Sequence, residues 1–171
     1  MIKIIDNFFD NKDLKIVQDF ALTKAFYTPR FFDEAPDKTD EHNYGNRWSF
    51  NNEPKLLDMF TKQAESKFKI KIKELYFDSG IDQRRLTVFK PHTDNHSILN
   101  ILIMISGPTA VTNGTVFYNK DNNICDLDIH VGFRENRAIL FPSDKMHSPH
   151  ANKEFNVTRY SATLFITNYE E

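Results

Sequence analysis

The residues with the clearest chemical potential form a short motif, Pro91-His92-Thr93-Asp94, in the middle of the chain. In an extended segment, side chains two positions apart point to the same side of the backbone. His92 and Asp94 could therefore offer an imidazole nitrogen and a carboxylate oxygen to one metal ion. Two histidines and one carboxylate on one face of an octahedron suit non-haem iron(II), because they leave other positions open. The motif is common by chance, so it predicts a metal site only together with a third ligand.

The third ligand is expected from the segment 141–150, where an apolar strand runs into a turn. This segment contains two histidines, His147 and His150. We favour His147 because it lies closer to the end of the strand 138–141, where its position is better fixed. His150 follows Pro149, in what we expect to be a loop, and it is the alternative ligand.

Arg159 lies in the segment 158–167, which we expect to be a strand. Alternation along a strand puts Arg159, Ser161 and Thr163 on one face. An arginine that faces the inside of a barrel is costly unless it is paired. Its guanidinium matches a carboxylate in bidentate geometry, and the Ser161 hydroxyl can bind the same group. The strand therefore predicts a clamp for a dicarboxylate beside the metal.

In this order, a His-x-Asp motif, a distal histidine and an Arg-x-Ser strand resemble the iron(II)/2-oxoglutarate dioxygenases. The resemblance is closest to the small prolyl 4-hydroxylase-like branch of bacteria and phages. Segment 113–118 is similar to the Gly-Gly-Thr-x-Phe-Tyr strand of that branch, with Asn113 in place of the first glycine. Segment 136–143 resembles the approach to the distal histidine, and the opening 4–9 is also similar. The resemblance covers residues 70–167 well and the preceding part loosely.

The resemblance implies a double-stranded β-helix, or jelly roll, and it implies a site for each reactant. His92, Asp94 and His147 would hold Fe(II), while Arg159 and Ser161 would hold the C5 carboxylate of 2-oxoglutarate. O₂ would be the oxidant, with ascorbate as a potential stimulant. The cosubstrate 2-oxoglutarate would be converted to succinate and CO₂, while a protein side chain or a small molecule is hydroxylated. The resemblance does not identify that prime substrate.

The elements that must position these residues change in character along the chain. Residues 2–5 predict a short strand, and Asp10 or Asn11 can cap a helix that extends to Ala25. Residues 29–46 are polar and predict a long loop, which in a compact domain is often a lid or a binding loop. A second helix is expected to begin near Pro54, a residue that suits the first helical position.

From residue 70 onward the sequence predicts short strands separated by turns. Their expected positions are 70–77, 86–89, 98–105, 115–118, 126–131, 138–141 and 158–167. Many short strands indicate a sandwich or a jelly-roll barrel. We therefore expect a mostly β protein, residues 1–171 forming a single domain. A helical N-terminal part, about 1–69, would pack on a cupin-like core of about 70–167.

The composition excludes few classes of protein, but it favours a globular protein of the cytoplasm. The net charge is −2 and 40% of the residues are hydrophobic, so neither a nucleic-acid partner nor a membrane partner is expected. The single cysteine, Cys125, cannot form an internal disulfide. The opening residues carry too short an apolar run for a signal peptide. Nothing in the sequence indicates an oligomeric state.

Two other functions fit part of this pattern. A cupin-like metal protein with different chemistry, such as an isomerase or a zinc hydrolase, would use the same three ligands without the arginine clamp. A non-catalytic binding module would keep the barrel and lose turnover.

Other polar residues have ordinary explanations. We expect Trp48 to be packed beside a surface Arg47, and Arg84 and Arg85 to be a solvated strand or the mouth of the substrate site. The remaining histidines are expected to be exposed (His42), in a loop near the site entrance (His96) and structural (His130).

Overall fold

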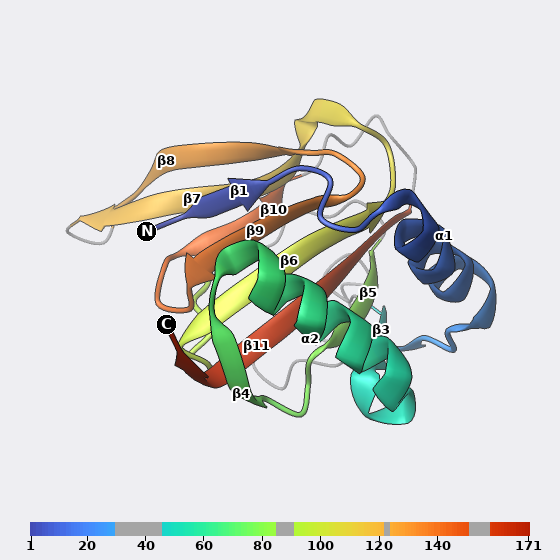
Figure 1. Cartoon of the computed structure of the whole chain (residues 1–171). Helices are drawn as coiled ribbons and strands as arrows, with labels where there is room; N and C mark the ends of the chain where they lie inside the picture. The colour runs from blue at the N-terminus through green and yellow to red at the C-terminus, as the bar shows by residue number, and fades with distance from the viewer. Residues whose placement is uncertain (30–45, 85–90, 122–123, 151–157) are drawn as a thin grey trace.

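The protein consists of two antiparallel sheets flanked by two α-helices (Figure 1). The computed structural model describes residues 1–29, 46–84, 91–121, 124–150 and 158–171. The strands are β1 Lys3–Ile5, β2 Thr28–Pro29, β3 Asn46–Ser49, β4 Lys71–Leu75, β5 Gly80–Arg84, β6 Leu99–Ser106, β7 Ala110–Asp121, β8 Ile124–Phe133, β9 Arg137–Pro142, β10 His147–His150 and β11 Arg159–Glu170. The predicted mostly β architecture with flanking helices is confirmed.

The larger sheet has the strand order β1-β9-β6-β11-β5-β3-β2, and β4 also pairs with β11. The smaller sheet has the order β10-β7-β8. Long-range pairing therefore dominates the fold: β11, near the C-terminus, is bonded to β4, β5 and β6. The first strand, β1, joins the opposite edge through β9.

Local sequence explains both helices. Helix α1, Asn11–Asp19, begins where the Asp10 side chain accepts a hydrogen bond from the backbone N–H of Asp13 at 2.8 Å. Its last turn runs into a wider π-helical turn over Phe20–Lys24. Helix α2, Pro54–Phe68, begins with proline in the first turn, as predicted. Its buried side chains recur at helical spacing: Leu56, Phe60, Ala64 and Phe68.

Strand alternation divides the apolar residues into two cores. One core lies between the helices and the large sheet, where β6 contributes Ile101, Ile103 and Ile105, and β11 contributes Ala162, Leu164 and Ile166. The second core is smaller and consists of Met104, Phe117, Val131, Phe133, Ile139 and Phe141. Because β7 and β8 belong to the small sheet, this second core lies between the two sheets. The inner face of β11, opposite its apolar face, is polar.

Some elements differ from the sequence prediction. Strand β5 begins at Gly80, in the interval between the predicted strands 70–77 and 86–89 where only a turn was expected. Strand β10 extends to His150, which was expected to lie in a loop. The N-terminal part also contributes β2 and β3 to the large sheet. The predicted strand 86–89 and most of the predicted loop 29–46 lie outside the described residues.

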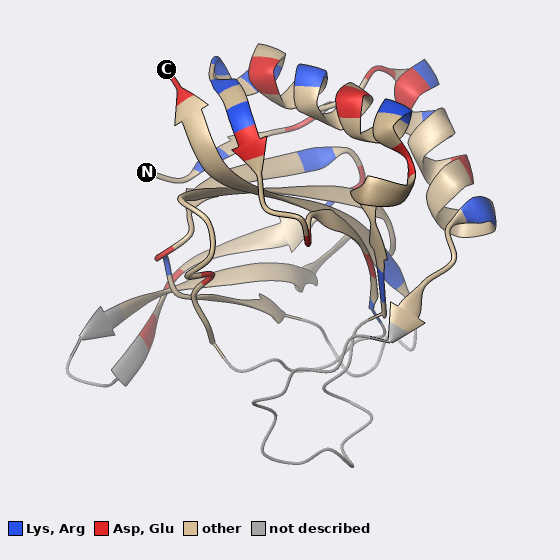
Figure 2. Ribbon diagram, turned by 90° about the horizontal axis from the view of Figure 1, so that it is seen from below, with Lys and Arg blue, Asp and Glu red and all other residues tan. Residues whose placement is uncertain are grey.

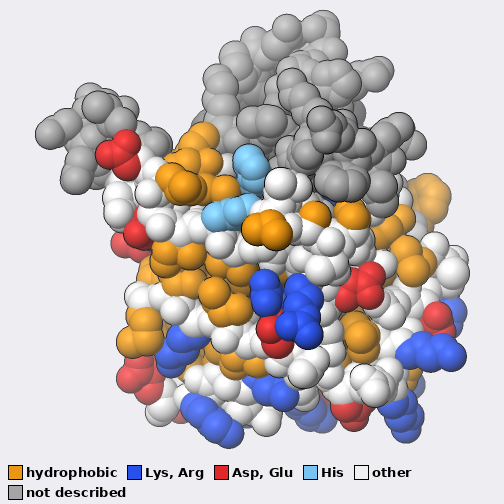
Figure 3. Space-filling model, turned by 90° about the horizontal axis from the view of Figure 1, so that it is seen from above, with side chains coloured by type: hydrophobic (Ala, Val, Ile, Leu, Met, Phe, Trp, Pro, Cys, Tyr) orange, Lys and Arg blue, Asp and Glu red, His pale blue; other side chains and the backbone are white. Residues whose placement is uncertain are grey.

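Charged side chains lie mainly on the outside of the molecule. Figure 2 marks many Lys, Arg, Asp and Glu positions along the helices, which lie at the outside of the molecule. On the face shown in Figure 3, charged, hydrophobic and uncharged side chains are interspersed. Within the described ranges, no helix is both long and apolar enough to cross a membrane.

One cluster of ion pairs links the residue after the N-terminal strand to the turn between β8 and β9. The Asp6 carboxylate accepts hydrogen bonds from Arg137 Nε at 2.6 Å and Nη2 at 3.0 Å, and from Arg134 Nη1 at 2.9 Å. The hydrogen bond from Arg137 is the main reason that the pKa of Asp6 lies below its ordinary value of 3.8. The cluster therefore stabilises the fold while Asp6 is ionised.

Replacing Asp6 with Asn should lower the free energy of unfolding by about 1 kcal/mol at pH 7. Because the folded-state pKa is depressed, this stabilisation is present above the unfolded value of 3.8 and is lost as the pH falls through the folded pKa. Urea unfolding of both proteins at a series of pH values should show the difference shrinking in acid. Glu170→Gln, which removes the exposed pair with Lys73, is the control and should change little. Equal stability of wild type and D6N at pH 7 would contradict this role.

Candidate metal centre

Two histidines from distant parts of the chain meet through their backbones. His92 N–H donates to the His147 carbonyl at 2.9 Å, and His147 N–H donates to the His92 carbonyl at 2.9 Å. Residues paired in this way present their side chains on the same face of a sheet. The two imidazole rings lie 4.5 Å apart between centroids. The pairing adds the segment around His92 to the edge of the small sheet, next to β10.

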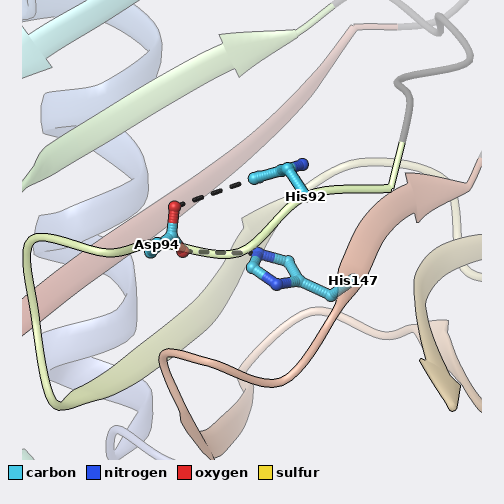
Figure 4. A group of neighbouring side chains, drawn as sticks. All are labelled: His92, Asp94 and His147. Atoms are coloured by element: carbon cyan, nitrogen blue, oxygen red, sulfur yellow. Dashed lines mark ion pairs between the residues drawn. The ribbon is translucent and has the colours of Figure 1, made fainter. Parts of the chain in front are cut away.

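Asp94 completes a group of three side chains (Figure 4). Its Oδ2 lies 3.4 Å from His147 Nε2, and its Oδ1 lies 4.0 Å from His92 Nε2. One ligand atom from each of the three residues falls within 4.8 Å of the others. We call His92, Asp94 and His147 the metal group.

A buried asparagine orients the carboxylate of the metal group. Asn100 Nδ2 donates to Asp94 Oδ2 at 2.6 Å, and Asn100 Oδ1 accepts from Ser97 Oγ at 2.7 Å. The Asp94 backbone N–H also donates to the Ser143 carbonyl at 2.9 Å. Asn100 is fully buried, so its amide has few other arrangements open to it. These bonds fix the carboxylate beside the two imidazoles.

The environment of His147 suits a neutral imidazole ligand. Its Nδ1 lies 2.9 Å from the Lys145 carbonyl, a contact in which Nδ1–H donates and Nε2 is left as the ligand atom. Burial, followed by the nearby His92, lowers the pKa of His147 to about 4. Near neutral pH the ring is therefore neutral, with its one N–H on Nδ1 and with Nε2 unprotonated.

These residues fit a divalent ion. Bonds of roughly 2.0–2.2 Å to histidine nitrogen and carboxylate oxygen place two ligands at right angles about 3 Å apart. The observed separations are close enough to that value for small side-chain rotations to complete the coordination. Three protein ligands on one side leave the other side for exogenous ligands.

Arg159, at the start of β11, lies inside the molecule and reaches the small sheet. Its side chain is 6% exposed. Nη1 donates to Asn113 Oδ1 at 3.1 Å, to the Gly114 carbonyl at 2.9 Å and to the His150 carbonyl at 3.4 Å. Burial lowers the pKa of Arg159 to about 9, which leaves it charged at neutral pH. Among the described residues, no carboxylate forms an ion pair with it.

Ser161 and Thr163 of β11 share the inner face with Arg159. Ser161 and Thr163 are buried, whereas Ala162 and Leu164 between and beyond them pack in the core under the helices. The predicted alternation is therefore confirmed. Ser161 stands opposite Asp82 of β5, and Arg159 stands opposite Arg84.

The other histidines that the structure describes lie outside the metal group. The His150 ring faces His130 at 5.2 Å, away from the group. The His96 ring packs between Tyr76 at 4.4 Å and Phe165 at 4.6 Å. His42, like Arg85, lies outside the described residues.

Trp48 is buried as predicted, but the prediction of a surface Arg47 is wrong. Arg47 is 6% exposed and forms a bidentate pair with Asp82, Nε to Oδ1 at 2.8 Å and Nη2 to Oδ2 at 2.7 Å. The two residues pair in register across β3 and β5. Their ion pair compensates each charge, which is why both can be buried.

Sequence reasoning missed the functional use of two asparagines. Asn100 was visible as a polar residue within the apolar run 98–105, which is a signal for a buried hydrogen-bonding role. Asn113 was visible as a departure from the Gly-Gly pattern. Its Oδ1 accepts from Arg159 and its Nδ2 donates to the Pro108 carbonyl at 3.1 Å. The next residue is a glycine because a side chain at Gly114 would collide with the Val131 carbonyl.

Comparison with known proteins identifies the fold. No family profile matches the sequence, and no curated protein matches it. Solved structures match over nearly the whole chain. HygX from Streptomyces hygroscopicus, with nickel, 2-oxoglutarate and hygromycin B bound, has a TM-score of 0.67 at 11% identity, covering 98% of this chain and 83% of that chain.

Two further structures show the range of proteins with this fold. A prolyl hydroxylase from Trichoplax adhaerens, in complex with a hypoxia inducible factor peptide, has a TM-score of 0.60 at 12% identity over 97% of this chain and 83% of that chain. The alpha ketoglutarate dependent epimerase SnoN of nogalamycin biosynthesis has a TM-score of 0.64 at 10% identity, covering 98% and 79%. At these identities the likeness establishes the fold. The chain has the jelly roll of the 2-oxoglutarate/iron(II) oxygenases, as the sequence resemblance predicted.

The choice between the two candidate histidines can be tested with a matched pair of variants. His147→Ala should abolish binding of Ni²⁺ or Co²⁺, because it removes one of three ligand atoms. His150→Ala should leave the affinity unchanged, because its ring lies away from the group. Titration calorimetry with each metal measures both. The reverse result would move the third ligand to His150.

Asn100→Ala should weaken divalent metal binding by about 10–100-fold, the range expected when a group that orients a ligand is lost. Asn51→Ala is the control, since the Asn51 side chain donates to the Phe77 carbonyl and does not contact the metal group. Unchanged metal affinity in N100A would show that Asp94 does not depend on this hydrogen bond.

Proposed function

We propose that this protein is an Fe(II)- and 2-oxoglutarate-dependent oxygenase whose residues 1–171 act as one catalytic domain. The observation that carries the proposal is that the metal group and Arg159 lie at opposite ends of one strand, β10. His147 is the first residue of β10, and Arg159 bonds to the carbonyl of His150 at the other end of that strand. Three residues of strand span about 10 Å. A metal ion and a buried cation at that spacing suit a small dicarboxylate held at both ends.

In this proposal His92, Asp94 and His147 hold Fe(II), while Arg159 and Ser161 hold the C5 carboxylate of 2-oxoglutarate. Bound iron and cosubstrate supply the oxidation by O₂, with succinate and CO₂ as products. The chain supplies the geometry. Asn100 holds Asp94, the Lys145 carbonyl holds the His147 tautomer, and Asn113 holds the guanidinium of Arg159.

The reaction we propose is hydroxylation of a protein side chain or a small molecule. Support for the wider class comes from the folds it resembles, which include a prolyl hydroxylase with a peptide and HygX with hygromycin B. The same group of folds includes an epimerase, so the type of oxidation depends on how the prime substrate is presented.

A cupin-like metal protein with isomerase or hydrolase chemistry would account for the metal group alone. It would give no reason for a charged arginine buried at the end of β10 without a carboxylate partner among the described residues. Burying such a charge is costly, and a cosubstrate carboxylate is the simplest group to compensate it.

The proposal is tested by combining turnover with binding. Wild type with Fe(II) should convert 2-oxoglutarate to succinate, and the nickel-loaded protein should bind 2-oxoglutarate in a calorimeter. Asp94→Ala should abolish both, because the metal is lost. Arg159→Gln should keep metal binding but weaken 2-oxoglutarate by about 10-fold or more, since a buried charge-assisted pair is removed.

Each variant is the control for the other. Asp94→Ala removes the metal, whereas Arg159→Gln affects only the binding of the dicarboxylate. Absence of 2-oxoglutarate binding to the metal-loaded wild type would overturn the proposal. Equal binding by R159Q would instead remove Arg159 from the site.

A further inference from the structure

Asn113 lies in an irregular part of β7. The register of β7 on β8 shifts between Ala110 and Gly114, so residues 111–113 form a bulge. A bulge changes the direction in which side chains point, and bulges are frequent beside active sites. Val111 in this bulge is 83% exposed, whereas Asn113 is fully buried. The bulge thus turns one polar side chain into the interior of the fold.

Two partners of opposite kind fix the orientation of the Asn113 amide. Its Nδ2 donates to the Pro108 carbonyl at 3.1 Å, and its Oδ1 accepts from Arg159 Nη1 at 3.1 Å. A carbonyl oxygen can only accept and a guanidinium can only donate, so the reversed amide would lose both hydrogen bonds. Asn113 therefore presents an uncharged acceptor to Arg159.

Nη1 is the atom through which the Arg159 side chain binds the protein. Besides the bond to Asn113, it donates to the Gly114 carbonyl at 2.9 Å and to the His150 carbonyl at 3.4 Å. A guanidinium has five N–H donors, of which Nη1 carries two. The side-chain bonds from Arg159 to described residues all come from Nη1. The edge formed by Nη2 and Nε is therefore the part of the fork that can receive a carboxylate.

These contacts hold the charge of Arg159 in place without neutralising it, because all three acceptors on Nη1 are uncharged. Asp82 raises the pKa of Arg159 through space, but burial and the neighbouring Arg84 lower it further. Asp82 itself forms the bidentate pair with Arg47. A carboxylate at position 113 would have nearly the shape of the amide and would compensate the buried charge. An amide at this position therefore preserves the attraction of Arg159 for an anionic ligand.

We propose that Asn113 is a positioning residue that gives the site its preference for a dicarboxylic over a monocarboxylic 2-oxo acid. The inference rests on the proposed function. Asn113 holds Nη1 of Arg159 through a neutral acceptor and so keeps the charge for the C5 carboxylate, which would meet Nη2 and Nε. A 2-oxo acid without that carboxylate gains nothing from the buried charge.

The test titrates nickel-loaded protein with 2-oxoglutarate and with 2-oxopentanoate, which has the same chain without the C5 carboxylate. Asn113→Asp should weaken 2-oxoglutarate by about 10-fold or more, because the new carboxylate compensates the charge of Arg159. The same variant should leave 2-oxopentanoate unchanged. Asn113→Leu removes both side-chain bonds but adds no charge, so it should weaken 2-oxoglutarate by less than about 5-fold.

Stability should follow the opposite order, which a purely structural role would not produce. Asn113→Asp compensates a buried charge, whereas Asn113→Leu leaves the Pro108 carbonyl without its donor. The unfolding midpoint of N113D should therefore exceed that of N113L. If Asn113 only supported the fold, N113L would be the weaker variant in both measurements. Asn51→Asp, the same change at an exposed position, is the control and should alter neither the affinity for 2-oxoglutarate nor the midpoint.

The inference and the proposed function fail in different ways. N113D that keeps the wild-type preference for 2-oxoglutarate, or that unfolds more readily than N113L, overturns the inference alone. An equal loss for both ligands in N113D also overturns it, since Asn113 would then act at the metal end. A wild-type protein that binds neither ligand removes the proposed function itself.

Discussion

The pair of backbone hydrogen bonds between His92 and His147 is the contact on which the site depends. The two residues are 55 positions apart in the sequence, and strands β6 to β9 lie between them. Only when those strands have formed does β10 lie where the segment around His92 can pair with it. Both imidazoles and, two residues on, the Asp94 carboxylate then point to one side. Formation of the metal group is therefore a consequence of closing the barrel rather than of any local structure.

The inner face of β11 carries a cost that the rest of the fold must offset. Arg159, Ser161 and Thr163 occupy positions that apolar side chains would fill in a stable core. Burying an arginine without an ionic partner lowers the free energy of unfolding by several kcal/mol, to order of magnitude. The compensation lies on the other face of the same strand. Ala162, Leu164 and Ile166 pack with the helices in the larger of the two cores. The helices thus stabilise a sheet whose opposite face is available for a polar site.

Periodicity in the sequence was sufficient to predict the two helices and most strands. It left a sandwich and a jelly roll as alternatives, and the family resemblance favoured the jelly roll. Periodicity was insufficient for β5, in which Asp82, Gln83 and Arg84 follow one another. A strand of this kind is stable only through partners elsewhere: Arg47 for Asp82, and the Tyr160 hydroxyl, which accepts from Gln83 Nε2 at 3.0 Å. Because those partners lie on β3 and β11, no local pattern reports them. The same holds for Arg47, whose burial depends on a carboxylate 35 residues away.

The preference for His147 over His150 has a firmer basis in the structure than its distance from the preceding strand. Both residues belong to β10, and they are three positions apart. Side chains in a strand alternate between faces, so an odd separation sends the two rings to opposite sides. His147 pairs in register with Phe117 of the inner core, whereas the His150 ring lies against His130. One strand can therefore deliver only one of them to a site between the sheets. Since Phe117 sets which side is inside, the apolar residues of β7 decide which histidine joins Asp94.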